Sequence, residues 1–397
     1  MMQISQRIQA LAPSATLAMS QKSAELKAAG VDVINMSVGE PDFDTPDFIK
    51  EAAKKAIDDN FSRYTPVPGY LSLRKAIAGK LLRENKIEFA PEQIVVGNGA
   101  KQELCNVLLA CINPGDEVII PVPAWVSYVE MVKLAEGVTV QVYAGVESDF
   151  KITPEQLEKA ITPKTRMIML NSPSNPTGSI YSYEELKGLA EVLAKYPDVI
   201  ILADEIYEHI NFTGEVHSIS EFESVRARVV IVNGVSKAYA MTGWRIGYMA
   251  GPLPIAKAVT KLQGQYTSGA SSIAQKAAEA AYNGSLECVE TMRKAFERRR
   301  DLIVKLAKEI PGWITNVPQG AFYLFPEVSS FIGKKYGDRE IKCSGDYVMY
   351  LLEEAHVACV DGEAFCAPGY MRLSYATSDD NIREAMRRIK EASAKLV

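Results

Sequence analysis

The chain has 397 residues, which suggests two or three domains, or one large α/β unit with an appendage. Its 44 Lys and Arg residues and 49 Asp and Glu residues give a formal net charge of −5, which argues against a nucleic-acid or membrane-surface protein. With 47% hydrophobic and 23% charged residues, the composition is that of a globular protein with a large core, and it excludes disorder as the main state.

The cysteines and histidines give no sign of a disulfide framework or of a metal site. The 6 cysteines are scattered without a C-x-x-C pair, and the 3 histidines show no paired spacing. The N-terminal segment interrupts its apolar residues with Gln, Arg and Ser, unlike a signal peptide, and no apolar run is long enough to span a membrane. We therefore expect a soluble cytoplasmic protein with free thiols and no metal.

In chain order, the first elements are helical. Apolar residues recur at helical spacing over residues 47–59 and 71–85. Residues 93–96 form a short strand candidate, and a glycine-rich turn over residues 97–101 leads into a further helical pattern from Gln102.

Short, almost wholly apolar runs follow, which is typical of strands buried on both faces. These runs are 117–121 (EVIIP), 166–170 (RMIML), 199–203 (VIILA), 229–232 (VVIV) and 246–250 (IGYMA). The pattern predicts an α/β fold in which a mostly parallel sheet lies in an α/β/α sandwich.

The character of the chain changes near residue 285. Charged helical patterns cover 286–309 and 379–395, and strand candidates lie at 321–325, 357–360 and 371–376. We predict a large domain of residues 46–284 and a smaller α+β domain made of residues 1–45 with 285–397. The N-terminal forty-odd residues should pack against this second domain, because they precede the sheet domain and carry no sheet of their own.

Four polar segments follow the predicted strands, and ligands of open α/β sheets bind at the carboxyl ends of strands. In the first, the glycines of residues 97–101 precede a helix, a pattern that can bind an anion or form a plain turn. In the second, the prolines of residues 171–178 either aim Asn175 into a cleft or shape a simple turn. In the third, Asp204 either caps a helix or joins Tyr207 in presenting polar groups to one ligand.

The fourth segment, residues 233–247, contains Lys237. A solvated lysine is the ordinary alternative, but the neighbours Val235, Tyr239, Met241 and Trp244 indicate that this segment is buried. Burial lowers the pKa of a lysine and makes its amine nucleophilic, as Schiff-base chemistry requires.

Taken together, several ordered motifs resemble one enzyme family. GVSKAYAMTGWRIG, with NPTG and DEIYEH before it and MRLSYA after it, resembles the class I, fold-type I aminotransferases that use pyridoxal phosphate. GEPDFDTP, RYTPVPGYLSLRKAI and PGDEVIIPVPAWVSY are similar to the bacterial aspartate aminotransferase group within it. The similarity extends from about Leu11 to the C-terminus.

The resemblance implies roles for particular residues toward the cofactor. Lys237 forms the covalent aldimine and moves the proton, Asp204 pairs with the pyridine nitrogen, and Tyr207 joins them as a catalytic residue. Tyr207 and Asn175 hydrogen-bond the ring oxygen, and Trp125 stacks on the ring. The remaining cofactor-binding residues that it implies, mostly around the phosphate, are Gly99, Ala100, Lys101, Ser236, Arg245 and, from a second subunit of a homodimer, Tyr64.

The resemblance also implies how the substrate binds. Arg372 grips the α-carboxylate beside the backbone of Gly39, while Trp125 and Asn175 line the same pocket. Lys101, with a hydroxyl from Thr16 or Ser14, reads the distal carboxylate. These roles imply an aspartate:2-oxoglutarate aminotransferase that binds amino acids and 2-oxo acids, and no nucleic acid or membrane.

Other activities on the same scaffold stay open. They are an aminotransferase with broader or aromatic specificity and a carbon–sulfur lyase. Residues 13–16 (PSAT) also resemble this family. Some family members act on prephenate as well and carry a basic residue just before the proline of this motif. Here that position is Ala12, which argues against this second activity.

Overall fold

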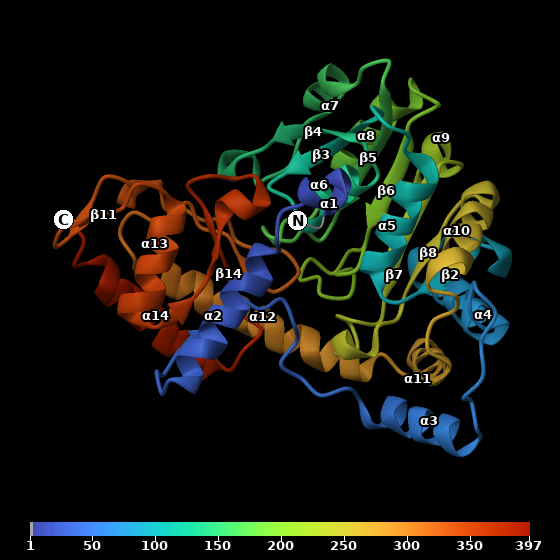
Figure 1. The fold of residues 1–397 in the computed structure, drawn as a ribbon, viewed down its shortest axis with the longest axis horizontal. Helices are drawn as coiled ribbons and strands as arrows, with labels where there is room; N and C mark the ends of the chain where they lie inside the picture. Colours follow the sequence, from blue (N-terminus) through green and yellow to red (C-terminus); the bar gives the residue numbers. More distant parts are fainter. Residues whose placement is uncertain (1–2) are drawn as a thin grey trace.

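A computed structural model describes residues 3–397 of the chain. Figure 1 shows a large sheet covered by helices on one side of the molecule and a smaller group of helices and short strands on the other. The smaller group combines C-terminal elements with α2 (Ala15–Ala28) near the N-terminus.

Within residues 3–397, the largest sheet has seven strands in the order β2-β8-β7-β6-β5-β3-β4. All its pairs are parallel except those of β8, which runs antiparallel to both β2 and β7. The mostly parallel sheet is therefore confirmed. The strands are β2 (Ile94–Gly97), β3 (Glu117–Val122), β4 (Val138–Tyr143), β5 (Thr165–Asn171), β6 (Ile200–Asp204), β7 (Val229–Gly234) and β8 (Gly247–Ala250).

Apolar side chains on both faces of these strands explain why the sheet lies between two layers of helices. In β3, Val118 and Ile120 belong to one hydrophobic cluster and Ile119 to another, so successive residues point to opposite faces. Helices α5 (Ala100–Cys111), α6 (Ser127–Leu134) and α10 (Leu253–Tyr266) contribute to the first cluster, and α7 (Pro154–Ala160), α8 (Tyr183–Ala194) and α9 (Glu223–Arg226) to the second. Each buried Ile, Leu or Val side chain contributes about 1.5–3 kcal/mol.

A third hydrophobic cluster covers the β2–β8 end of the sheet. It combines residues of β2 and β8 with α3 (Asp47–Asp58), α4 (Leu71–Lys80) and α11 (Ser272–Asn283). The helix predicted over residues 71–85 is confirmed as far as Lys80, and the chain then continues as one π-helical turn, Leu81–Asn85.

The edge strand β4 was not among the predicted strands. Its sequence VTVQVY mixes polar and apolar residues, and only Val142 in it is buried. Because an edge strand has one open side and here a largely exposed surface, it lacks the apolar run that revealed its neighbours.

The smaller part contains several short strands. β9 (Tyr323–Leu324), β13 (Val360–Asp361) and β14 (Met371–Ser374) form an antiparallel sheet in the order β13-β14-β9, and β10 (Lys335–Tyr336) pairs with β11 (Arg339–Glu340). Its helices are α12 (Glu287–Ala307), α13 (Ser344–Tyr350) and α14 (Asp379–Ser393).

The N-terminal residues supply one strand to this part, since β1 (Ile34–Asn35) pairs in parallel with β12 (Val357–Ala358). One prediction for this part was wrong. The single strand predicted over residues 357–360 is instead two strands, β12 and β13, that belong to different sheets. Strands of two residues are too short to show a period in the sequence.

The N-terminal segment nevertheless contacts both parts of the molecule. Ile34 and Met36 belong to the same hydrophobic cluster as the buried faces of α12 and α14. By contrast, α1 (Gln6–Gln9) lies beside α6, and Arg7 forms an ion pair with Glu136 at 3.2 Å. The proposed division into residues 46–284 and residues 1–45 with 285–397 stays a prediction.

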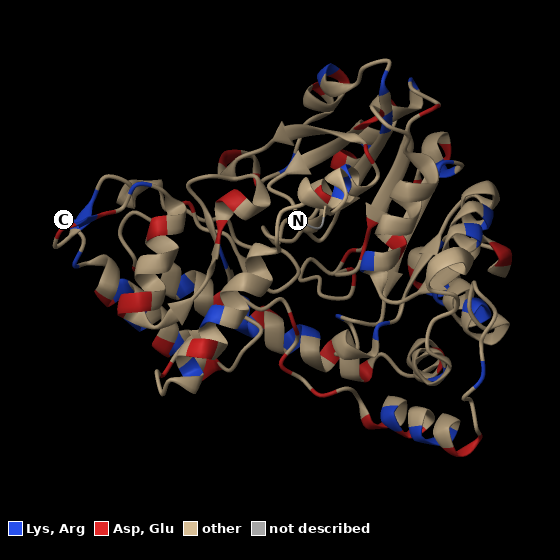
Figure 2. Ribbon diagram, viewed as in Figure 1, with Lys and Arg blue, Asp and Glu red and all other residues tan. Residues whose placement is uncertain are grey.

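Charged residues lie mainly on the outer helices. Figure 2 shows Lys and Arg interspersed with Asp and Glu along α3, α12 and α14, while the strands of the large sheet are mostly uncharged. Among the described residues, no helix combines the length and apolar character needed to cross a membrane.

Candidate active site

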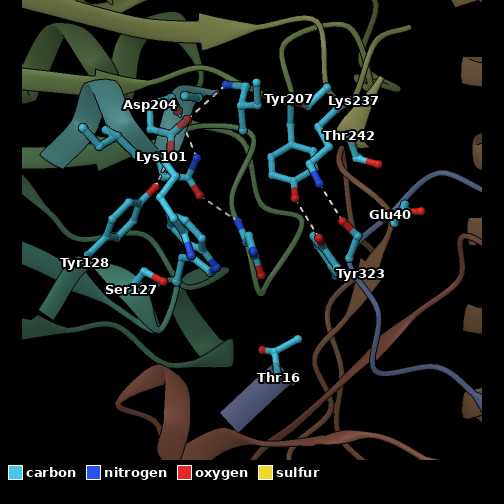
Figure 3. Close-up of a pocket in the computed structure, with 18 of the residues that line it drawn as sticks. Thr16, Glu40, Lys101, Ser127, Tyr128, Asp204, Tyr207, Lys237, Thr242 and Tyr323 are labelled. Atoms are coloured by element: carbon cyan, nitrogen blue, oxygen red, sulfur yellow. Dashed lines mark hydrogen bonds between the residues drawn. The ribbon is translucent and has the colours of Figure 1, made fainter. Parts of the chain in front are cut away.

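A cavity of about 380 Å³ opens where the large sheet, the smaller part and the N-terminal segment meet. Polar residues reach it from the carboxyl ends of the parallel strands β5, β6 and β7, the position where ligands bind in open α/β sheets. Figure 3 shows Asp204, Tyr128 and Lys101 on one side of this space and Tyr207, Lys237 and Tyr323 on the other.

Most of the residues singled out in the sequence lie in this one cavity. The predicted residues that line it are Ser14, Thr16, Gly39, Ala100, Lys101, Trp125, Asn175, Asp204, Tyr207, Ser236, Lys237, Arg245 and Arg372. Gly99 directly precedes this lining at the N-cap of α5. Tyr64 does not line the cavity, and its side chain is 100% exposed.

Lys237 lies in the turn after β7, in the buried segment that the sequence predicted. Val235, Tyr239 and Met241 are buried around it, which excludes a solvated surface lysine. Burial lowers the pKa of Lys237 to about 8, although the nearby Glu40 raises it. Its Nζ donates a hydrogen bond to the carbonyl oxygen of Gly39 at 2.6 Å. An amine with this pKa is partly neutral near pH 7 and can act as a nucleophile or base.

Asp204 is the last residue of β6 and does not cap a helix, because the residues after it form a turn. It accepts hydrogen bonds from the Tyr128 hydroxyl at 2.7 Å and from the Ile206 N–H at 3.2 Å. Burial raises the pKa of Asp204 to about 6 against the effect of these bonds. Within residues 3–397 it forms no ion pair, so the carboxylate is available to a cationic group in the cavity.

Arg372, on β14, is a buried guanidinium with unused hydrogen-bonding capacity. It donates to the Asn175 side-chain oxygen at 2.9 Å and to the Ser37 carbonyl oxygen at 2.6 Å. Its Nε has no hydrogen-bond partner among the described residues, none of which forms an ion pair with this arginine. A buried cation without a carboxylate partner is a site for an anionic ligand.

A second anion site lies where α5 begins. Gly99 has φ +88°, and a Cβ atom there would lie 2.4 Å from an Arg245 guanidinium nitrogen, so a side chain at this position would displace the arginine. Arg245 donates to the carbonyl oxygens of Thr242 at 2.7 Å and Asn98 at 3.2 Å. Together with the free N–H groups at the start of α5, this arrangement suits a phosphate.

Lys101 and Thr16 lie at the mouth of the cavity. The Lys101 Nζ lies 4.7 Å from the centre of the Trp125 ring, and burial, helped by Arg245, lowers the pKa of this lysine. The Thr16 hydroxyl is buried without a partner in the described part of the chain, while the Ser14 hydroxyl accepts the N–H of Leu17 at the start of α2. Of the two hydroxyls considered in the sequence, that of Thr16 is the free one.

Sequence reasoning missed two tyrosines of the cavity. Tyr128 bonds to Asp204, and Tyr323 hydroxyl lies 2.7 Å from that of Tyr207. Tyr323 belongs to the apolar run AFYLF, which reads as the core of a strand. Tyr128 follows Trp125 by one helical turn, and this spacing was the one available signal.

Comparisons with known proteins agree with this arrangement. Residues 31–389 match the family described as aminotransferase class I and II. An aspartate/prephenate aminotransferase of Nitrosomonas europaea is 51% identical over 392 residues, covering 98% of this chain and 99% of that protein. An aspartate aminotransferase of Geobacillus stearothermophilus is 49% identical over 393 residues, 98% of each chain.

Solved structures show the same fold. The aspartate aminotransferase of Rhizobium meliloti superposes with a TM-score of 0.97 at 43% sequence identity, covering 100% of both chains. That of Thermus thermophilus with maleate gives a TM-score of 0.93 at 41% identity, covering 99% of this chain and 100% of the other. The fold, the cavity and these matches together show that the chain belongs to the class I and II aminotransferases.

Proposed function

We propose that this aminotransferase moves the amino group of L-aspartate to 2-oxoglutarate, giving oxaloacetate and L-glutamate, with pyridoxal phosphate bound at Lys237. The observation that carries the proposal is the cavity itself. It combines a lysine whose pKa is lowered to about 8 with a buried carboxylate that lacks a cationic partner and a buried arginine that lacks an anionic one. The relatives named as aspartate aminotransferases support the choice of substrate.

The residues present fit the cofactor that this family uses. The unpaired Asp204 carboxylate suits a protonated ring nitrogen, and the start of α5 with Arg245 suits a phosphate. Ser236, which is buried beside Lys237, adds a hydroxyl, and Trp125 offers a ring face. Bound here, the cofactor supplies an electron sink for the pair left when the substrate Cα loses its proton.

The protein side chains would then handle protons at defined atoms. The Lys237 amine would take the proton from the substrate Cα and hold it for return, because its lowered pKa leaves a fraction of it neutral. The Asp204 carboxylate would pair with the ring nitrogen and keep it protonated. The Tyr207 hydroxyl and the Asn175 side chain, which both line the cavity, are proposed to hydrogen-bond the ring oxygen.

The two carboxylates of aspartate would bind at opposite ends of the cavity. Arg372 binds the α-carboxylate, and Nε is the atom that now lacks a partner. The distal carboxylate binds the Lys101 ammonium and the free Thr16 hydroxyl. The second activity in the name of the Nitrosomonas relative is not proposed here, because Ala12 offers only its backbone N–H, which donates to Glu130 at 2.8 Å.

Borohydride reduction tests the cofactor assignment. Reduction of the purified yellow protein should fix pyridoxal phosphate to one peptide, the one that contains Lys237. A Lys237→Ala variant should still bind the cofactor non-covalently but lose nearly all turnover. Attachment at another lysine, or a protein that stays colourless after incubation with the cofactor, would contradict the proposal.

An amino-donor panel with 2-oxoglutarate tests the substrate. Lys101→Ser should lower kcat/KM for aspartate about 10- to 150-fold, because one charge-assisted contact is worth about 1.5–3 kcal/mol. Alanine and phenylalanine, which lack the distal carboxylate, serve as internal controls and should be nearly unaffected. An equal loss for all donors would show that Lys101 acts through the cofactor.

We also propose a homodimer with shared active sites, in the cytoplasm. The dimer rests on the resemblance of Tyr64 to the tyrosine that reaches the phosphate from the neighbouring subunit, and the full exposure of Tyr64 leaves its ring accessible to a second chain. Sedimentation should show a dimer, and Tyr64→Phe mixed with Lys237→Ala should give activity that differs from simple dilution. A fully active monomer would overturn this proposal.

A further inference from the structure

We propose that Tyr323 is a positioning residue that donates its hydroxyl proton to the Tyr207 oxygen and so directs the Tyr207 O–H toward the ring oxygen of the cofactor. The inference rests on the proposed function and adds to it a residue outside the roles considered so far. It depends on how the buried Tyr323 side chain lies against Tyr207, Gly39 and Arg372.

The structure holds the Tyr323 hydroxyl in one place. Its oxygen lies 2.7 Å from that of Tyr207, and the two rings meet edge to face at 79° with centres 5.8 Å apart (Figure 3). Gly39 makes room for this hydroxyl, because a Cβ atom there would lie 2.4 Å from it. The carbonyl oxygen of the same Gly39 accepts the hydrogen bond of Lys237.

The direction of the shared hydrogen bond follows from the charge beside it. The guanidinium of Arg372 lies over the face of Tyr323, 4.5 Å from the centre of its ring. A positive charge over the ring stabilises the phenolate form, so it makes Tyr323 the stronger acid of the pair. Burial raises the pKa of Tyr323, and Arg372 and the bond to Tyr207 lower it. Arg372 also lowers the pKa of Tyr207, but burial, Tyr323 and Asp204 together hold that pKa well above its ordinary value.

The stronger acid donates and the weaker acid accepts, which leaves the proton of Tyr207 free. Within residues 3–397 the Tyr207 hydroxyl has no hydrogen-bond partner other than Tyr323. Because Tyr207 also lines the cavity, the proton it retains is available to a ligand there. A phenol that accepts one hydrogen bond becomes a better donor in the next, so Tyr323 strengthens the bond that Tyr207 makes to the cofactor.

The visible absorbance of the resting holoenzyme, titrated with pH in the absence of substrate, tests this role. A hydrogen bond to the anionic ring oxygen favours the deprotonated chromophore and lowers its pKa. Tyr323→Phe keeps the ring but removes the donor, and it should raise the pKa of the chromophore by roughly 0.3 to 1 unit. Tyr207→Phe should raise the pKa further.

Two comparisons separate this role from a purely structural one. Since Tyr323 acts through Tyr207, the double variant Tyr207→Phe/Tyr323→Phe should titrate like Tyr207→Phe alone. Tyr375→Phe is the matched control, because among the described residues the hydroxyl of this buried tyrosine bonds only to the Ala321 carbonyl oxygen, and Tyr375 does not line the cavity. It should leave the titration unchanged.

Each outcome decides between the two proposals. A wild-type protein without a titrating visible band overturns the proposed function and this inference with it. A normal wild-type titration that Tyr323→Phe leaves in place overturns the inference alone. Additive shifts in the double variant would also overturn it, because they would mean that Tyr323 reaches the cofactor without Tyr207.

Discussion

Two of the buried carboxylates at and after the end of β6, those of Asp204 and Glu208, have different surroundings. Asp204 lines the cavity, whereas Glu208, four residues further on, does not line it and bonds to Lys80, Asn85 and Asn233. The pKa of Asp204 is raised to about 6, whereas that of Glu208 is lowered to about 2. Both side chains are buried, so burial alone does not account for the difference.

Glu208 has a full set of partners. Lys80 of α4 forms an ion pair with one of its oxygens, and the side-chain amides of Asn85 and Asn233 donate to the carboxylate at 2.8 and 2.6 Å. Burial raises the pKa of Glu208, but the charges of Lys80 and His209 and these hydrogen bonds outweigh it. The cluster therefore ties α4 and β7 to the segment that carries Asp204 and Tyr207.

Asp204 has a tyrosine hydroxyl and one backbone N–H, and within residues 3–397 no cation is paired with it. Burying an unpaired carboxylate is costly, and one that lines a cavity together with other titratable groups is suited to bind a cationic ligand group. The contrast teaches that the partners of a buried acid, rather than its depth, distinguish a structural group from one kept for a ligand.

The largest effect on stability is expected from removing the charge of Glu208, the carboxylate that is paired with a cation. Glu208→Gln removes the nearer, buried counter-charge of Lys80 and leaves it only Glu84 at 3.8 Å, so it should lower the free energy of unfolding by about 3 kcal/mol. Chemical denaturation of the cofactor-free protein measures this loss. Lys80→Met added to Glu208→Gln should recover much of it, since the buried ammonium is then gone. A Glu208→Gln protein as stable as the wild type would show that the ion pair contributes nothing.

Removing the charge of Asp204, which has no cationic partner among the described residues, should have the opposite effect on stability. Asp204→Asn removes an unfavourable buried charge, so the cofactor-free protein should be at least as stable at pH 7. Turnover with aspartate should nevertheless fall about 10²- to 10³-fold, the usual cost of losing one preorganised charge in a catalytic site. Steady-state kinetics with bound cofactor confirmed by absorbance checks this expectation. Near-normal turnover would show that another group keeps the ring nitrogen protonated.

The sequence indicated that Asp204 belongs to a site, but it gave no sign of the ion pair that Glu208 forms. Asp204 stands out because it follows an apolar strand directly and lies in a family motif. Glu208 lies in the same motif, but its partner Lys80 is 128 positions away, and no local pattern reveals such a pairing. Tyr323 was not predicted as a site residue for a related reason. Its run AFYLF indicates a buried strand, and nothing in the run indicates that the Tyr323 hydroxyl bonds to Tyr207.

The same distinction explains which parts of the fold were predictable. Strands such as β7, with every residue buried, produce an apolar run that can be recognised in the sequence. The exposed edge strand β4 and the pairing of β1 with β12 depend on contacts between distant segments. The cavity was predictable as a set of residues, because strand ends and the family resemblance identified them, whereas their hydrogen bonds were not.

The dependence of stability on pH gives the smallest and most discriminating test. The folded pKa of Asp204, about 6, exceeds its ordinary value of 3.8, so its contribution to stability is complete below about pH 4 and is lost as the pH rises through 6. The folded pKa of Glu208, about 2, lies below its ordinary value of 4.5, so its contribution is complete above about pH 4.5 and is lost as the pH falls toward 2.

Each of these shifts corresponds to about 3 kcal/mol over its pH window. In cofactor-free protein, Asp204→Asn should therefore flatten the stability curve between about pH 4 and 6, and Glu208→Gln should flatten it below about pH 4.5. Urea unfolding at a series of pH values measures both slopes. Adding pyridoxal phosphate should remove the Asp204 slope, because a protonated ring nitrogen then stabilises the carboxylate, and should leave the Glu208 slope in place. If the cofactor changed both slopes equally, the two carboxylates would share one environment, and the distinction between them would fail.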